Sequence, residues 1–177
     1  MDNQNNIKSN GVAKDLVIER VFDAPRELVW KAWSDSELMK KWWGPRNWSA
    51  PTAMIDFKVG GKYLLAMRGQ MGPGMPEVTT WSGGVYKEII PMEKIVVLDS
   101  FTDEQGNKVH ASKYGLPESF PMESEITMTF EDAGEGKTKL TVYYPDITGI
   151  EGAMLENMTQ GWNQSLDKLA EALNHNK

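Results

Sequence analysis

The sequence of 177 residues contains no cysteine and only two histidines, His110 and His175. Without cysteine, the chain can form no disulfide, no thiolate metal site and no thiol nucleophile. A metal site needs several converging ligands, and no cluster of other ligand residues accompanies either histidine. Ser82, Ser100 and Ser112 lack the flanking pattern of a nucleophile elbow. We therefore predict no metal, no cofactor and no catalytic residue.

Long apolar runs and basic clusters are also missing. No apolar stretch approaches the roughly 20 residues that span a bilayer, so we expect no insertion into a membrane. The net charge is −6, and no basic run with interleaved aromatic residues is present, which argues against a nucleic-acid partner. The opening residues, MDNQNNIKSNGVAKD, lack the apolar centre of a secretory signal. Together with the absence of cysteine, this predicts a cytoplasmic protein.

The chain shows no internal repeat and no linker that would divide it. Its length fits one domain with a sizeable core. The first residues are rich in Asn, Gln and Ser, which is typical of a loose terminus. We predict a flexible tail over residues 1–14 and a single domain over residues 15–177. Whether that domain is a monomer or a homodimer is left open.

The longest amphipathic segment runs from Thr148 to Leu173. Its apolar residues recur at steps of three and four, which predicts one long helix. Pro145 cannot continue a preceding strand, and Asp146 or Thr148 can cap the helix. The apolar stripe consists of Ile150, Met154, Met158, Trp162, Leu166, Leu169 and Leu173. A stripe of this length needs a broad apolar surface to cover it.

The first part of the domain is predicted to contain a strand and two short helices. Residues 16–22 alternate in the manner of a strand, and Pro25 then favours the start of a helix. Ser34 and Glu37 have the spacing of a capping box, which would open a second helix. Gly44 is expected to end that helix.

The apolar period then changes to two, which predicts a series of strands. The predicted strands are 53–58, 61–67, 79–89, 94–101, 122–131 and 138–144. Most are joined by short turns and are therefore antiparallel, because parallel pairs need a long crossover. Two stretches, 69–76 and 102–121, are long enough to be functional or mobile loops. The sequence thus predicts an α+β fold in which a curved antiparallel sheet wraps around the long C-terminal helix.

Several motifs, taken in their order and spacing, resemble a known family. They are ERVFDAP at 19–25, LVWKAW at 28–33, LMKKWWGP at 38–45, DFKVGG at 56–61, GVYKEI at 84–89, GW at 161–162 and LDKL at 166–169. Together they resemble the bacterial proteins related to the C-terminal domain of the activator of heat shock protein 90 ATPase. Those proteins belong to the START/SRPBCC, Bet v-like helix-grip superfamily. The resemblance runs from about residue 17 to residue 173.

The resemblance implies a helix-grip fold with an internal cavity between the sheet and the C-terminal helix. The family includes a chaperone-activating domain, ligand carriers and proteins of unknown role, so the fold does not fix the function. Lys58 stands where the family often has Arg. A point charge is not equivalent to a planar guanidinium, so the resemblance does not by itself establish an ion pair between Lys58 and Asp56.

Asp99 is the polar residue with the clearest functional interest. Alternation places it on one strand face with Ile95, Val97 and Phe101, and a carboxylate on an apolar face must be paired or shift its pKa. It can serve in a structural ion pair, as a polar anchor for a ligand or as a general base. The candidate partners for an ion pair are Arg68, Lys87 and Lys62.

Glu123 and Glu125 share a strand face with Thr127 and Thr129. A solvated face opposite a buried one explains this pattern, with a catalytic carboxylate pair as the alternative.

Seven tryptophans and eleven methionines favour an adaptable apolar interior, and the Met-rich first half of the long helix can roof a cavity. Cavity sites are mostly apolar with a few polar anchors. The expected lining is Trp81, Phe101, Met128, Met154, Met158 and Trp162, with Asp99 and Arg68 as the polar anchors.

The leading interpretation is therefore a domain that binds a small hydrophobic or amphipathic ligand. One alternative is a co-chaperone module that contacts a chaperone and stimulates its ATPase, and this follows from the resemblance alone. Another is a cyclase or hydrolase acting on a ligand in the cavity. The residues do not identify the ligand.

Overall fold

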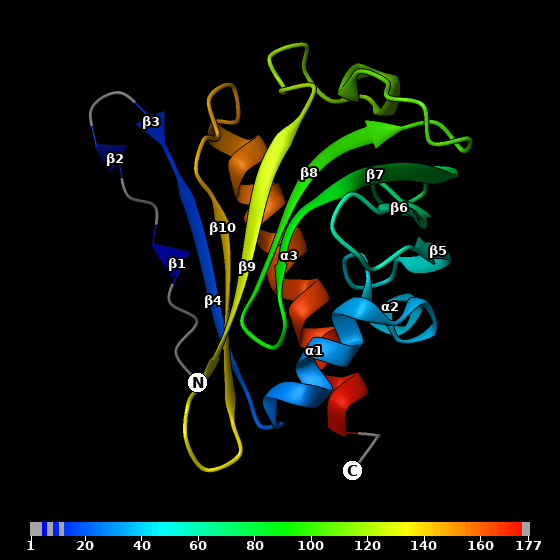
Figure 1. Ribbon diagram of the computed structural model, residues 1–177. Helices are drawn as coiled ribbons and strands as arrows, with labels where there is room; N and C mark the ends of the chain where they lie inside the picture. Colours follow the sequence, from blue (N-terminus) through cyan, green and yellow to red (C-terminus); the bar gives the residue numbers. More distant parts are fainter. Residues whose placement is uncertain (1–4, 7–8, 11–12, 175–177) are drawn as a thin grey trace.

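The computed structural model describes residues 5–6, 9–10 and 13–174, which form a curved antiparallel sheet, two short helices and one long helix (Figure 1). The strands are β1 (Asn5–Asn6), β2 (Ser9–Asn10), β3 (Ala13–Lys14), β4 (Leu16–Phe22), β5 (Ser49–Ile55), β6 (Lys62–Gln70), β7 (Glu77–Ile90), β8 (Lys94–Thr102), β9 (Ser124–Asp132) and β10 (Thr138–Tyr144). The helices are α1 (Arg26–Ser34), α2 (Ser36–Trp42), the single 3₁₀ turn η1 (Ala111–Tyr114) and α3 (Gly152–Asn174). The predicted α+β, helix-grip architecture is confirmed.

The main sheet has the order β1-β4-β10-β9-β8-β7-β6-β5. From β5 to β10 each strand pairs with the next one in the chain, as the short turns predicted. Strand β4 then pairs with β10, so that Leu16 lies opposite Tyr144 and Phe22 opposite Thr138. The first long strand of the chain thereby lies beside the last one, and β5 is left at the far edge.

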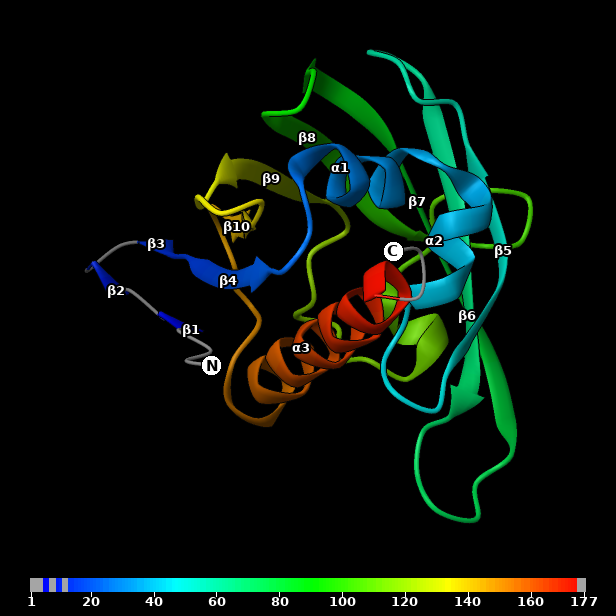
Figure 2. The same ribbon diagram turned by 90° about the horizontal axis from the view of Figure 1, so that it is seen from below.

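The long helix α3 lies in the hollow of the curved sheet (Figure 2). Helices α1 and α2 carry the chain from β4, near one edge of the sheet, to β5 at the other edge. An antiparallel sheet has one face to cover and α3 has one apolar stripe to bury, so each element covers the other.

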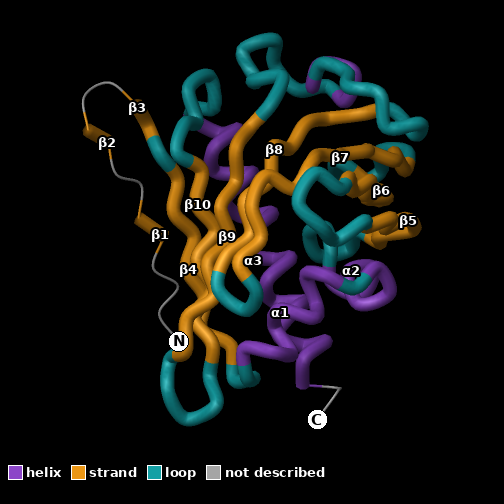
Figure 3. Tube along the Cα trace, in the orientation of Figure 1, coloured by secondary structure: helices purple, strands orange, loops and turns teal. Residues whose placement is uncertain are grey.

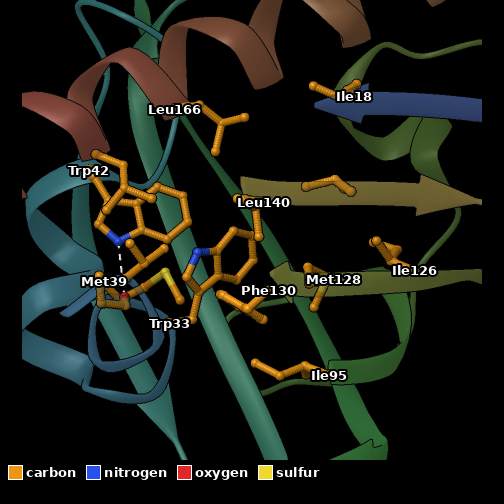
Figure 4. Packing of buried hydrophobic residues seen from close by; sticks show 14 of the residues in the cluster. Ile18, Trp33, Met39, Trp42, Ile95, Ile126, Met128, Phe130, Leu140 and Leu166 are labelled. Carbon is orange, nitrogen blue, oxygen red and sulfur yellow. Dashed lines mark hydrogen bonds between the residues drawn. The ribbon is translucent and has the colours of Figure 1, made fainter. Parts of the chain in front are cut away.

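The second half of α3 is packed into the core. Leu166 and Leu169 are fully buried and Leu173 is nearly so. Close to this half of the helix, the ring of Trp33 lies between Trp42 and Phe130, with ring centres 4.8 and 6.1 Å away (Figure 4). This aromatic group joins α1, α2 and the sheet beneath the end of α3.

One ion pair also holds α3 to the sheet. Arg20 on β4 donates from Nη1 to Asp167 Oδ1 at 2.6 Å, and its Nη2 donates to the carbonyl oxygen of Asn163 at 3.4 Å. The Arg20 side chain is mostly buried, so these bonds are less screened by water than a surface pair.

Local glycine conformations explain why α3 begins at Gly152 and not at Thr148. Gly149 and Gly152 have φ values of 88° and 55°, in the left-handed region that interrupts a helix. Asp146 does accept a hydrogen bond from the Thr148 amide at 2.8 Å, but this bond closes a turn before the helix. Ile150, predicted as the first residue of the helical stripe, is fully buried in that connection.

The predicted capping box at Ser34 is wrong. The N-cap of α2 is Asp35, whose Oδ1 accepts hydrogen bonds from the amides of Glu37 and Leu38 at 2.9 and 3.0 Å. The Ser34 hydroxyl instead donates to the carbonyl oxygen of Trp30 at 3.2 Å, within its own helix. The helix is therefore capped by the carboxylate of Asp35, one residue after the Ser34 hydroxyl that the spacing had suggested.

Strand β5 also lies earlier than predicted, at Ser49–Ile55 instead of residues 53–58. The chain after it turns sharply, since the amides of Lys58 and Gly61 donate to the carbonyl oxygens of Asp56 and Lys58. A Cβ at Gly61 would collide with the Asp56 carbonyl, so only glycine fits there. At the surface of this turn Lys58 pairs with Asp56 at 3.0 Å.

Most of the predicted N-terminal tail, residues 1–4, 7–8 and 11–12, lies outside the described residues, as does His175. Where the tail is described, β1 pairs with β4, and β2 pairs with β3. None of the helices within the described part of the chain has the length and apolar character needed to cross a bilayer.

Candidate ligand-binding cavity

A cavity of about 500 Å³ lies between the concave face of the sheet and the first half of α3. Strands β5 to β10 all contribute side chains to it. The sheet side of its lining includes Ile55, Tyr63, Leu65, Met67, Ser82, Tyr86, Ile95, Val97, Asp99, Phe101, Ile126, Met128 and Tyr144. Helices and loops contribute Trp33, Met39, Trp43, Pro45, Leu116, Phe120, Met154, Asn157, Met158, Trp162 and Ser165.

The burial of α3 changes along its length where the cavity begins. Met154, Met158 and Trp162 lie on the same apolar stripe as Leu166 and the leucines after it, but they remain only partly buried. Their side chains line the cavity, whereas the later leucines are buried in the hydrophobic core. The Met-rich first half of the helix therefore forms a wall of the cavity.

Asp99 is the only charged side chain in the cavity lining among the described residues. It points inward from β8 because residues alternate along the strand, with Val97 before it and Phe101 after it on the same face. The Tyr63 hydroxyl donates to Asp99 Oδ1 at 2.6 Å. Burial raises the pKa of the Asp99 carboxyl to about 7, and the Tyr63 hydrogen bond opposes that rise.

Three tyrosines of the lining keep their protons at neutral pH. Burial raises the phenol pKa values of Tyr63, Tyr86 and Tyr144 above the ordinary value. The nearby charge of Asp99 contributes to the rise at Tyr63 and Tyr144. These hydroxyls are therefore hydrogen-bond donors and not bases under ordinary conditions.

The end of the cavity near α1 is aromatic. The Trp162 ring stacks on Trp33 with centres 6.1 Å apart and planes at 15°, and it meets the ring of Trp43 edge to face at 5.7 Å. The indole N–H of Trp162 donates to the hydroxyl of Tyr144 at 2.9 Å. Within the described part of the chain, the buried indole N–H groups of Trp33 and Trp43 have no hydrogen-bond partner.

Two loops lie against the cavity. Lys168 on α3 donates from Nζ to the carbonyl oxygens of Trp43, Gly44 and Trp48 at 3.3, 3.0 and 2.9 Å, and so holds the segment that carries Pro45. The second loop follows β8, and the loops there gather at the end of the sheet where α3 begins (Figure 3).

The loop after β8 is fixed to the start of α3 by a close contact. The Ser119 hydroxyl donates to the carbonyl oxygen of Gly149 at 3.0 Å. A Cβ at Gly149 would collide with the Ser119 carbonyl. Because Leu116 and Phe120 of this loop line the cavity, the contact positions part of its wall.

Six of the eight residues predicted for the site lie in the lining. These are Asp99, Phe101, Met128, Met154, Met158 and Trp162. The other two, Trp81 and Arg68, lie outside it. Strand alternation directs Trp81 to the face opposite its inward-facing neighbour Ser82, and Arg68 pairs at the surface with Glu77 at 3.0 Å.

The partner of Asp99 is a tyrosine and not one of the three basic residues expected from the sequence. Lys62 and Lys87 are exposed, and Arg68 is paired elsewhere. Glu123, which precedes β9, and Glu125, on β9, both lie outside the cavity lining. Glu123 pairs with Lys108, and Glu125 is exposed.

Several residues of the lining were not predicted from the sequence. They are Tyr63, Tyr86, Tyr144, Trp33, Trp43 and the loop residues Leu116, Pro117, Phe120 and Pro121. Alternation with Leu65 was an available signal for Tyr63, because both side chains face inward from β6. No local pattern marks the loop residues.

Comparison with known proteins agrees with this architecture. The family described as Activator of Hsp90 ATPase homolog 1-like protein matches residues 23–174. Among solved structures, a protein from Arthrobacter aurescens is 23% identical, with a TM-score of 0.73 over 96% of this chain and 91% of that one. The AHSA1 protein from Silicibacter pomeroyi is 21% identical, with a TM-score of 0.67 over 92% and 99% of the two chains.

A protein from Chromobacterium violaceum is 25% identical, with a TM-score of 0.62 over 89% of this chain and 95% of that one. The comparison with curated proteins gives no match. The family match nevertheless spans most of the chain and includes strands β5 to β10 and α3. The protein therefore belongs to the family of Activator of Hsp90 ATPase homolog 1-like proteins.

Proposed function

We propose that the protein binds a small hydrophobic or amphipathic molecule in the cavity between its sheet and α3. The observation that carries this proposal is a cavity of about 500 Å³ whose lining, in the described part of the chain, is almost wholly apolar and contains one inward-facing carboxyl group, Asp99. Ligand sites typically measure about 300–1,000 Å³ and combine apolar walls with a few polar groups that orient the ligand.

Ordinary core packing does not account for a space of this size. Protein interiors contain few voids larger than a water molecule, because the loss of packing contacts is costly. A bound apolar body would recover roughly 25 cal/mol for each Å² of apolar surface that it buries, before the costs of association. The soft side chains of Met154 and Met158 on the α3 wall can adjust to ligands of different outline.

A variant that fills the cavity tests the proposal directly. Ser82→Phe places a ring in the lining from β7, while Thr79→Phe places the same ring on an exposed position of the same strand. Tryptophan fluorescence follows titration with lipids, polyketides and flavonoids, since Trp33, Trp43 and Trp162 line the cavity. Binding should be lost in Ser82→Phe and kept in Thr79→Phe, with circular dichroism confirming that both variants fold.

Mass spectrometry under native conditions provides a second measurement on protein purified from its host. A co-purified small molecule should be present in the unmodified protein and in Thr79→Phe but absent from Ser82→Phe. If the broad panel gives no response and no molecule co-purifies, the proposal fails.

A second candidate function is a direct contact with a chaperone of the Hsp90 class, supported by the family's description. The surface offers one feature suited to such a contact. The hairpin that joins β6 and β7 extends away from the rest of the domain (Figure 2), and Met71 and Met75 near its tip are each about half exposed. Exposed apolar groups clustered on one projection are typical of interaction sites.

An ATPase assay with the host's Hsp90-type chaperone tests this candidate. Met71→Ser combined with Met75→Ser should remove any stimulation of the ATPase, whereas Met54→Ser, at an exposed position on β5, should not. The candidate is discarded if saturating protein leaves the ATPase rate unchanged.

A further inference from the structure

The Asp99 carboxyl group in the cavity indicates the chemistry of the ligand's polar end. Asp99 Oδ1 accepts the Tyr63 hydrogen bond, and among the described residues Asp99 Oδ2 has no hydrogen-bond partner. No Lys, Arg or His of the described chain lines the cavity. An ionised carboxylate in apolar surroundings is costly unless a cation or further donors meet it, and the protein itself supplies only the one tyrosine.

The surroundings of Asp99 are aromatic, which suits a cation and not an anion. The rings of Tyr63 and Tyr86 lie 5.4 Å apart, and Phe101 follows on the same face of β8. The faces of aromatic rings attract ammonium groups, most strongly where water is excluded. A ligand carboxylate would instead meet the negative charge of Asp99 with no basic side chain to offset it.

We propose that the cavity selects amphipathic amines, in which an ammonium group pairs with Asp99 Oδ2 and an apolar body packs against the Met and Trp side chains of α3. This proposal rests on the proposed function of ligand binding and adds the chemical class of the ligand. Tyr63 positions the carboxylate by holding Oδ1, so that Oδ2 is presented to the cavity. Tyr86 and Tyr144 remain neutral donors beside it.

A series of compounds with the same decyl chain and different head groups isolates the role of Asp99. Decylamine, decan-1-ol and undecanoate carry a cation, a neutral hydroxyl and an anion on this chain at about pH 8. We expect decylamine to bind about tenfold more tightly than decan-1-ol, because a charge-assisted contact is worth about one order of magnitude or more, and undecanoate to bind most weakly. 4-Phenylbutylamine and 4-phenylbutan-1-ol repeat the comparison with an aromatic body.

Asp99→Asn should remove the preference for the amine and leave the affinity for decan-1-ol unchanged. Glu125→Gln is the matched control, since it deletes one carboxylate from the exposed side of the neighbouring strand β9. This control should keep the full preference. Calorimetry gives the dissociation constants, and circular dichroism verifies that each variant is folded.

The unmodified protein provides an independent test through pH. The titratable groups that face the cavity near Asp99 are Tyr63 on β6, Tyr86 on β7 and Tyr144 on β10, and all three stay protonated. Ser124 lies opposite Asp99 on β9 and carries no charge. On α3 the facing residues Met154, Asn157 and Met158 carry no charge, and neither do Leu116 and Phe120 of the loop. Asp99 is therefore the group whose charge changes between about pH 6 and pH 8.

Decylamine should bind more tightly as the pH rises through this interval, while decan-1-ol should show no trend. Equal affinity for amine and alcohol, or a preference that survives in Asp99→Asn, would overturn the proposal. Tighter binding of decan-1-ol at the lower pH would also overturn it, because the site would then act as a protonated donor. In each of these outcomes binding in the cavity itself still stands. If no compound of either series binds while a ligand of the broader panel does, the amine proposal fails alone. If the broader panel is also silent and no molecule co-purifies, the proposed function fails as well.

Discussion

Tyr63 reaches Asp99 across a glycine. The strand register places Tyr63 opposite Gly84, and Gly84 opposite Asp99, so the three residues form one row across β6, β7 and β8. Because Gly84 has no side chain, the phenol ring can lie over it and donate to Asp99 Oδ1 at 2.6 Å. A Cβ at Gly84 would lie 2.6 Å from the Tyr63 hydroxyl oxygen and would also collide with the Leu98 carbonyl. The polar pair of the cavity therefore depends on the absence of a side chain between its members.

Gly84→Ala should break this pair and destabilise the fold. Overpacking a tight site typically costs about 1–3 kcal/mol, and here the added methyl group meets both a backbone oxygen and the ring that must move. Urea denaturation measures the free energy of unfolding. Gly72→Ala is the control, because its Cβ would meet only the flexible side chain of Met75. An unchanged free energy of unfolding in Gly84→Ala would show that Tyr63 does not occupy this space.

The raised pKa of Asp99 predicts a pH dependence of stability. Its folded-state pKa of about 7 lies above the ordinary value of 3.8, so the folded state favours the protonated carboxyl. Stability from this group is present below about pH 4 and is lost as the pH rises through about 7, by an amount on the order of a few kcal/mol. The measurement is the difference in free energy of unfolding between the unmodified protein and Asp99→Asn at several pH values.

Asparagine carries no charge, so Asp99→Asn should gain stability relative to the unmodified protein as the pH rises from about 5 to 8. Taking the difference at each pH removes the contributions of other titrating groups, such as Asp103 and Asp146. A difference that stays constant with pH would mean that Asp99 titrates at its ordinary value, and that burial does not raise its pKa.

The hydrogen bond from Trp162 to Tyr144 links α3 to the last strand of the sheet. Tyr144→Phe removes the acceptor of the Trp162 indole N–H, which the stacked ring of Trp33 cannot replace. A fully buried donor without a partner costs about 1–3 kcal/mol, and because this bond is only partly buried we expect a loss of stability of about 1 kcal/mol. Tyr143→Phe, at the next position on the opposite strand face, should have little effect. Thermal unfolding of both variants tests this prediction. Equal melting temperatures for Tyr144→Phe and Tyr143→Phe would contradict it.

Sequence patterns were sufficient for the order of elements and for much of the cavity lining. The bounds of β4 and β10 were predicted without error, because alternation and flanking turn residues mark both ends. Asp99, Phe101 and Met128 were selected because strand parity is a local property that needs no knowledge of the partner strands.

What the sequence did not reveal depends on contacts between distant segments. The Tyr63 partner of Asp99 follows from the register of three strands, and no local pattern encodes that register. Trp81 was placed in the lining as one of the many tryptophans, although its position beside Ser82 directs it to the other face of β7. The late start of α3 reflects two glycines in left-handed conformations, which override a continuous apolar stripe.

Lys168 joins α3 to the loop that carries Pro45 at the cavity. Its Nζ donates to three backbone carbonyls of the segment 43–48, and burial lowers the pKa of its ammonium group. Lys168→Met keeps most of the stem but leaves those carbonyls without their charged donor, which should cost about 1.5–3 kcal/mol of stability.

The effect should be local, because Lys168 binds three carbonyls of this segment, whereas Leu166 and Leu169 stay buried in the core. The segment keeps its other contacts with α3, in which the Arg46 amide donates to Gln164 Oε1 at 3.0 Å and the Arg46 side chain pairs with Glu171 at 2.9 Å. Hydrogen exchange in Lys168→Met should therefore accelerate at the amides of residues 43–49 and stay unchanged in β9 and β10. Lys41→Met, an exposed lysine on α2, is the control for loss of charge. If exchange in the loop does not change, the three hydrogen bonds do not hold it, and packing together with the Arg46 contacts must fix the wall of the cavity near Pro45.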